Sequence, residues 1–166
     1  LMKGRYLPSA YSLSITCLVT VGADNVKLDV IQQTTIQGTA GDDVFTFNAG
    51  TPGGADHEVI LNGETTYYDA ALVRAIAFNG AGGDDEAFLT GTAGSDTVNL
   101  RGDGTADMAD TTYAIDLAGT ETIRAYGGGG TDVAKMYGTA GKDTFTAHPS
   151  ACSLGGAGFY VYAGGF

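Results

Sequence analysis

Basic residues are scarce in this sequence, which limits the partners that it can bind through charge. Lysine and arginine number 8 against 19 aspartates and glutamates, and the net charge is −11. Nucleic acids and anionic lipid surfaces are bound through clusters of Lys and Arg. The balance therefore argues against both partners, and an acidic, lysine-poor surface suits a secreted protein or one that collects cations.

Cysteine and histidine are nearly absent as well. Cys17 and Cys152 stand at opposite ends of the chain, which predicts two separate buried thiols and no disulfide. His57 and His148 come with no HExxH or CxxC pattern, and zinc needs about four ligands close together. We therefore expect both histidines at the surface or in turns, and no zinc site.

The chain also lacks proline-rich stretches and long apolar runs. Only 3 prolines are present, which excludes a collagen or a proline-rich linker. No apolar run is long enough to predict a membrane span. The chain starts with basic residues, continues with a mostly apolar stretch and reaches small residues at 21–23, which is typical of a secretory leader. However, apolar and polar residues alternate over 13–21, which is typical of a β-strand. Residues 1–22 are thus interpreted as a capping strand or a leader segment, and 23–166 as one repeat domain.

Glycine is the residue in excess. The chain has 27 glycines among 166 residues, whereas average usage of roughly 7% would give about 12. With 9 tyrosines and 7 phenylalanines, the chain is too aromatic for a disordered glycine tract. The glycines are therefore predicted to form tight turns between short strands.

Many of these glycines belong to one motif, Gly-Thr-Ala-Gly followed by one variable residue and an aspartate. The three strict copies begin at Gly38, Gly91 and Gly138, and two looser copies begin at Gly80 and Gly127. We call these the strict and the loose turns. Residues 80–100 align without gaps with 127–147, which indicates an internal duplication over 47 positions.

An alternating pattern follows every motif aspartate. Two and four residues after it the side chain is apolar in all five copies, at Phe45 and Phe47, Ala87 and Leu89, Val98 and Leu100, Ala134 and Met136, and Phe145 and Ala147. The residues between are mostly polar, which predicts a strand of about five residues with one buried face. Four further runs alternate in the same way, at Glu58–Leu61, Val73–Phe78, Tyr113–Leu117 and Thr122–Tyr126.

These elements predict an all-β solenoid, a β-roll or right-handed parallel β-helix of short strands joined by Gly/Asp turns. The duplication suggests two coils of about 23 residues each, with the three strict turns on a common edge. If 102–107 is a degenerate turn, two rows of aspartates form: Asp85, Asp107 and Asp132 along one edge, and Asp96 and Asp143 along the other.

The motif resembles the nonapeptide G-G-x-G-x-D-x-U-x of the RTX (repeats-in-toxin) family, where U is a large apolar residue. Gly38, Gly41, Asp43 and Phe45 fall on its two glycines, its aspartate and U, and the other copies match likewise. The longer repeat is similar to that of giant repeat-bearing bacterial surface proteins, over most of 23–166. Copies here are eleven residues apart at closest, whereas RTX units follow every nine residues.

The resemblance implies a parallel β-roll with calcium held in the turns by aspartates and backbone carbonyls. The implied metal ligands are Asp43, Asp85, Asp96, Asp107, Asp132 and Asp143. Without a metal, each aspartate instead caps its own turn by accepting hydrogen bonds from backbone N–H groups two residues on. Both interpretations stay open at this point.

The function predicted from these features is that of a non-catalytic, calcium-binding structural or adhesive repeat module of a secreted or cell-surface bacterial protein. Its expected partners are calcium, extracellular polysaccharide or neighbouring repeats. Adjacent acidic residues on a strand point to opposite faces, so no catalytic dyad is expected. The alternative is a carbohydrate-binding or polysaccharide-modifying, lyase- or epimerase-like β-helix. A row of exposed rings would favour it, from the candidates Tyr67, Tyr68, Phe88, Tyr113, Tyr126 and Tyr137.

Overall fold

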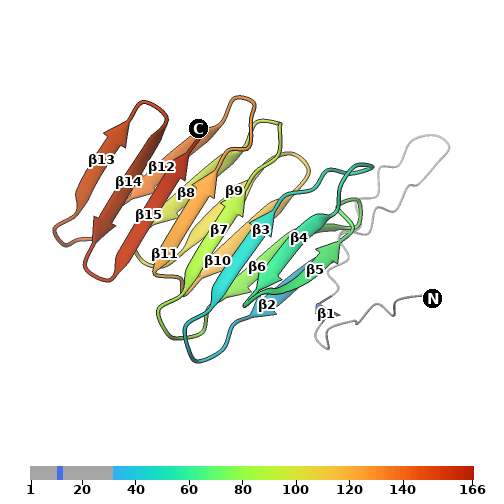
Figure 1. The fold of residues 1–166 in the computed structure, drawn as a ribbon, viewed down its shortest axis with the longest axis horizontal. Helices are drawn as coiled ribbons and strands as arrows, with labels where there is room; N and C mark the ends of the chain where they lie inside the picture. The colour runs from blue at the N-terminus through green and yellow to red at the C-terminus, as the bar shows by residue number, and fades with distance from the viewer. Residues whose placement is uncertain (1–10, 13–31) are drawn as a thin grey trace, which may run out of the picture.

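The computed structural model describes residues 11–12 and 32–166, and every regular element in this part is a β-strand (Figure 1). The strands are β1 (Tyr11–Ser12), β2 (Gln32–Gln37), β3 (Val44–Asn48), β4 (His57–Leu61), β5 (Glu64–Tyr68), β6 (Val73–Asn79), β7 (Glu86–Thr90), β8 (Thr97–Arg101), β9 (Ala106–Ala109), β10 (Ala114–Ala118), β11 (Thr122–Tyr126), β12 (Val133–Tyr137), β13 (Thr144–His148), β14 (Ala151–Gly156) and β15 (Phe159–Gly164). The strand expected over 13–21 and Cys17 lie outside the described residues. Among the described residues, no helix is present that is long and apolar enough to cross a membrane.

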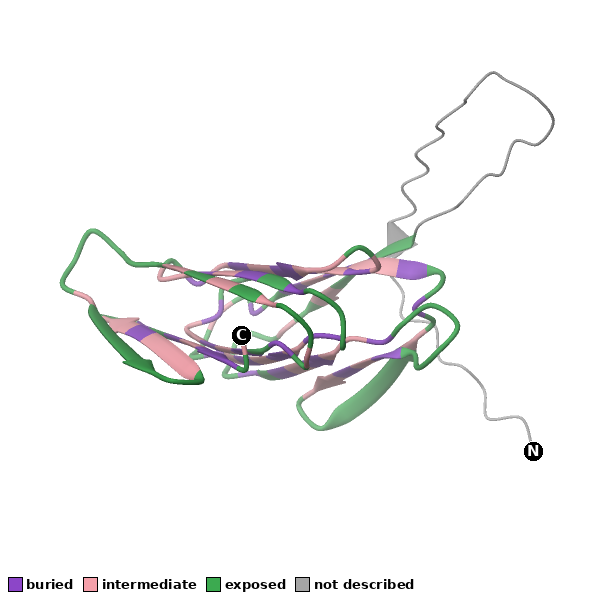
Figure 2. Cartoon of the chain, turned by 90° about the horizontal axis from the view of Figure 1, so that it is seen from above, coloured by how far each residue is buried: buried purple, intermediate pink, exposed green. Residues whose placement is uncertain are grey.

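The strands form two sheets that face each other as two layers (Figure 2). Sheet A has the order β1-β2-β6-β10-β9-β8-β12, and sheet B the order β13-β14-β15-β11-β7-β3-β4-β5. Neighbours β2, β6 and β10 are parallel in sheet A, as are β3, β7, β11 and β15 in sheet B. The chain therefore winds between two parallel ladders, and the predicted all-β solenoid is confirmed.

Each strict turn leads into a three-stranded antiparallel meander. The meanders are β3-β4-β5, β8-β9-β10 and β13-β14-β15. The chain then crosses to the other sheet for β6 or β11, and a loose turn returns it to β7 or β12. Successive meanders lie in sheet B, sheet A and sheet B, so each repeat unit is placed on the opposite layer from the one before it.

This arrangement corrects two expectations about the coils. The first strict turn stacks on a loose turn 42 residues later and the second on one 36 residues later, so a coil is far longer than about 23 residues. The meander strands account for the extra length. The turns at Gly38 and Gly138 lead from sheet A to sheet B, whereas the turn at Gly91 leads from B to A. The three strict turns therefore do not share an edge.

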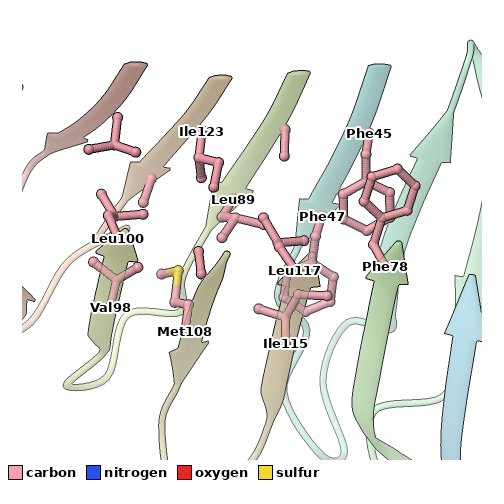
Figure 3. Packing of buried hydrophobic residues seen from close by; sticks show 14 of the residues in the cluster. Phe45, Phe47, Phe78, Leu89, Val98, Leu100, Met108, Ile115, Leu117 and Ile123 are labelled. Atoms are coloured by element: carbon pink, nitrogen blue, oxygen red, sulfur yellow. The ribbon is translucent and has the colours of Figure 1, made fainter. Parts of the chain in front are cut away.

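The inward positions predicted after each aspartate form the core. Those on β3, β7 and β8 are fully buried, and the rings of Phe45 and Phe78 stack across the two sheets with centroids 4.3 Å apart (Figure 3). The inward residues of β12 are only half-buried, and those of β13 are exposed, with Phe145 60% exposed. β12 and β13 are the edge strands of their sheets, so no further strand covers them.

The sequence predicts His57 at the surface or in a turn, and this prediction is wrong. It begins β4 and is 1% exposed, with its ring beside those of Phe47 and Tyr113. The Gly50 N–H donates to its Nδ1 at 2.8 Å, and burial lowers the pKa of the imidazole. His148 is exposed, as expected. Cys152 is a free thiol, but it is half-buried where a buried one was predicted.

Candidate functional site: the stacked glycine–aspartate turns

Each strict turn is closed by hydrogen bonds between its threonine and its aspartate. In the first, the Thr39 N–H donates to Asp43 Oδ2 at 2.6 Å, and the Gly41 N–H donates to Thr39 Oγ1 at 3.1 Å. The turns at Gly91 and Gly138 repeat both bonds. The threonine thus orients the loop, and the carboxylate accepts an N–H that has no strand partner. This explains the residue types and their spacing in the motif.

The first glycine of each motif is required because no space exists for a side chain. A Cβ at Gly38 would lie 2.6 Å from both Asp43 Oδ2 and the Gly80 carbonyl oxygen of the next coil. At Gly91 it would lie 2.7 Å from the oxygen of its own aspartate and 2.6 Å from the Gly127 carbonyl. The glycine therefore lets the carboxylate and the neighbouring coil approach the same point on the backbone.

Carboxylates also join one coil to the next. The Asp43 N–H donates to Asp85 Oδ1 and the Asp96 N–H to Asp132 Oδ1, each at 2.8 Å. The Asp85 N–H continues the first row by donating to Glu121 Oε2 at 2.8 Å. In both rows a strict turn stacks on a loose turn, and the later carboxylate accepts the earlier backbone N–H. We call these the carboxylate rows.

The loose turn at Gly80 differs in its second residue. Ala81 has a φ of 73°, in the left-handed region, and its N–H donates to Asn79 Oδ1 at 3.1 Å. In the strict turns the corresponding N–H donates to the motif aspartate. Asp85 Oδ2 is consequently buried without a hydrogen-bond partner.

Burial and neighbouring negative charges raise the pKa of two carboxylates in the rows. The pKa of Asp85 is raised, first by burial and then by the charges of Asp43 and Glu121. Burial also raises the pKa of Asp96, with smaller contributions from neighbouring acidic groups. By contrast, the pKa of Asp43 is lowered, first by the Asn62 amide that donates to it and then by the Thr39 N–H. The rows therefore mix carboxylates that favour their charged form with others that do not.

The expected rows of aspartates are corrected by the structure. Asp85 stacks with Asp43 and not with Asp132, which stacks with Asp96 on the other edge. Asp107 is in no turn, because 102–105 is a hairpin and Asp107 lies on β9. There its carboxylate accepts from Asn99 Nδ2 at 2.6 Å and pairs with Arg101 at 2.7 Å. Asp143 caps the last strict turn, beside β13 and away from Asp96.

Three residues of the rows were missed by sequence reasoning. Glu121 takes the aspartate position in the third coil, but its turn lacks the motif. Tyr113 is buried, and its hydroxyl donates to Asp96 Oδ1 at 2.7 Å. Asp110 accepts from Thr92 Oγ1 at 3.2 Å. All three come from chain segments distant from the turn that they support, and no local pattern marks them.

Hydrogen bonds engage both oxygens of two row carboxylates, whereas Asp85 Oδ2 is buried without a partner. Calcium takes six to eight oxygen ligands, but both oxygens of Asp43 and of Asp96 already accept hydrogen bonds. Within 11–12 and 32–166, no three His, Cys, Asp or Glu side chains are grouped so as to hold a metal. The arrangement matches the capping alternative, except that the N–H donors lie four residues before the aspartate or on the preceding coil. Calcium binding stays a prediction.

The aromatic candidates are divided among several surfaces. Phe88 and Tyr126 lie on the outer face of sheet B, and Tyr137 lies on that of sheet A. Tyr67 is 61% exposed on β5, whereas Tyr113 is buried. Tyr68 is half-buried against the core. The six residues therefore do not form one row, although Tyr67, Phe88 and Tyr126 share the outer face of sheet B, with Tyr67 three strands away from Phe88.

Comparison with models of protein families, with curated proteins and with solved structures finds no match to this chain. The resemblance to the RTX nonapeptide accordingly rests on the motif residues themselves.

Proposed function

We propose that this chain is a non-catalytic structural and adhesive repeat module of a secreted or cell-surface protein. The main support for the proposal is that the motif carboxylates are buried and accept hydrogen bonds from the backbone. Asp43, Asp85 and Asp96 are each 1% exposed, and each accepts a backbone N–H from its own turn or from the preceding coil. A catalytic acid or base must reach its substrate, and these groups face the protein backbone instead.

The carboxylate rows support a structural role because a solenoid depends on contacts between neighbouring coils. Backbone N–H groups at stacked turns have no strand partner, and leaving them buried and unpaired would cost free energy. Carboxylates that accept these groups let turns stack closely, so the outer faces of both sheets are held in fixed register. Such a module suits spacing or display outside the cell. The acidic, lysine-poor composition supports that location.

Thermal unfolding in calcium and in EGTA, at matched ionic strength, tests whether the turns need a metal. If hydrogen bonds alone hold the turns, we expect the two midpoints to agree within about 1 °C. Calcium at 100 times its dissociation constant would add about 2.7 kcal/mol and raise the midpoint by roughly 5 to 10 °C. If Asp85→Asn loses this rise in midpoint while the strand variant Asp107→Asn keeps it, calcium binds in the turns. That result would contradict the account in which hydrogen bonds alone hold the turns.

A further inference from the structure

The outer face of sheet B carries aromatic side chains from three adjacent parallel strands. β7 contributes Phe88, β11 contributes Arg124 and Tyr126, and β15 contributes Tyr160 and Tyr162. We call these five residues the aromatic face. Phe88, Arg124 and Tyr162 lie side by side in register across the three strands. The two tyrosines of β15 were not among the candidates that the sequence suggested.

Contacts within the aromatic face hold its rings in place. The Arg124 guanidinium lies 5.5 Å from the ring centroid of Phe88 and 5.7 Å from that of Tyr160. Its charge is paired with Glu86. The rings of Tyr126 and Tyr162 are 5.8 Å apart at 54°. A ligand would therefore meet rings that are already ordered, which reduces the entropy lost on binding.

A shallow groove lies on each side of the β15 tyrosines. One, of about 500 Å³, is lined by Tyr126, Tyr162, Ser150 and turn glycines. The other, of about 570 Å³, runs over β13 and β14 beside Tyr160. Its lining carries hydroxyl and amino groups, from Thr144, Thr146, Ser153 and Lys142. The aromatic rings therefore lie next to grooves lined by small and hydroxyl-bearing residues, along one side of the solenoid.

We propose that the aromatic face binds a linear neutral polysaccharide of β-linked hexoses, lying across the strands. Sugar rings present C–H faces that stack on aromatic rings, and hydroxyls that bond to Ser, Thr and Lys. Phe88 and Tyr162 are two strands apart, about 9.6 Å at the usual strand spacing and roughly the length of two linked hexoses. Rings on a rigid sheet would therefore match the repeat of an extended glycan.

The composition of the face suits a neutral sugar chain, because it combines aromatic rings with hydroxyl groups. Outward positions on β7, β11 and β15 hold aromatic, hydroxyl, charged and glycine residues but no aliphatic side chain: Glu86, Phe88, Thr90, Thr122, Arg124, Tyr126, Tyr160, Tyr162 and Gly164. Protein interfaces are also enriched in aromatic residues and Arg, so contact with a second copy of the chain is the competing use of this face, and self-association separates the two. A polyanionic glycan is disfavoured because Arg124 is already paired and the net charge is −11. The inference rests on the adhesive role proposed above and names its ligand class.

Affinity electrophoresis tests the proposal with three neutral glycans in the gel: hydroxyethylcellulose, mixed-linkage β-glucan and β-mannan. We expect retardation by at least one of them, weakened at least about tenfold in Tyr160→Ala/Tyr162→Ala. Tyr137→Ala is the matched control, because Tyr137 is an exposed tyrosine beside an arginine, Arg101, on the outer face of sheet A. Unfolding midpoints of all variants establish that they are folded, and Phe88→Ala provides a second test on another strand.

Three outcomes would overturn the proposal. They are no retardation by any of the three glycans, equal retardation of the wild type and both aromatic-face variants, or retardation by polygalacturonate alone. Self-association lost in the same variants would instead assign the face to contact between copies of the chain. None of these results bears on the calcium and EGTA midpoints, so failure here is distinguishable from failure of the structural account.

Discussion

Gly38→Ala is expected to lower the free energy of unfolding by about 3 kcal/mol, whereas Gly41→Ala in the same turn changes it by less than about 0.5 kcal/mol. A Cβ at Gly38 would lie 2.6 Å from Asp43 Oδ2 and 2.6 Å from the Gly80 carbonyl oxygen. Asp43 Oδ2 cannot move away without weakening the Thr39 N–H bond that closes the turn, and the Gly80 oxygen belongs to the backbone of the next coil. A Cβ at Gly41 meets only Thr39 Oγ1, at 3.9 Å, and the backbone there is not left-handed.

Urea unfolding of the two variants beside the wild type measures both effects. The pair is matched, because the substitution is the same and the positions are three residues apart in one turn. Equal losses of stability would show that alanine is unfavourable in the turn for general reasons. The requirement for glycine at the first motif position would then not arise from close approach of the next coil.

Asp96→Ala is expected to cost about 2 to 6 kcal/mol, which is among the largest effects of any motif substitution. The carboxylate is 1% exposed and accepts the Thr92 N–H at 3.1 Å and the Tyr113 hydroxyl at 2.7 Å. Its removal leaves two buried donors without an acceptor, and each costs about 1 to 3 kcal/mol.

Asp143→Ala is the control for this prediction. Asp143 makes the same bond to the threonine of its turn, but Thr139 is exposed, so water replaces the lost acceptor. We expect a cost of about 0.5 to 1 kcal/mol, as for an exposed cap. Chemical denaturation of both variants decides the point. A loss at Asp96 no larger than that at Asp143 would mean that the buried row contributes little to stability.

Strands and turns were predictable because their signals are local. The alternating runs at Glu58–Leu61 and Thr122–Tyr126 fall within β4 and on β11, and the five post-aspartate strands are all present. Period-two alternation depends only on which sheet face a residue occupies, and that is shared by neighbours in sequence. The prediction for Asp107 is wrong because Gly-Asp-Gly-Thr-Ala-Asp has the composition of the motif, while its glycines form a hairpin.

Stacking of the coils was not predictable, because it is decided by pairing between distant strands. Nothing within the strict turn at Gly91 indicates that three meander strands follow it. Nor does the turn indicate that it stacks on the loose turn at Gly127. The same holds for the carboxylate rows, in which Glu121 and Tyr113 take part without any motif of their own. Burial at Phe145 likewise depends on whether another strand covers β12 and β13.

Amide hydrogen exchange at Asp96 tests the carboxylate rows most directly. Its N–H lies in a turn and donates to Asp132 Oδ1 on the next coil at 2.8 Å. We predict slow exchange of this amide in the wild type and fast exchange in Asp132→Ala, because local opening then needs no loss of that bond. The Asp43 amide, which donates to Asp85 on the opposite edge, should exchange slowly in both proteins. An Asp96 amide that exchanges equally fast with and without Asp132 would contradict the account.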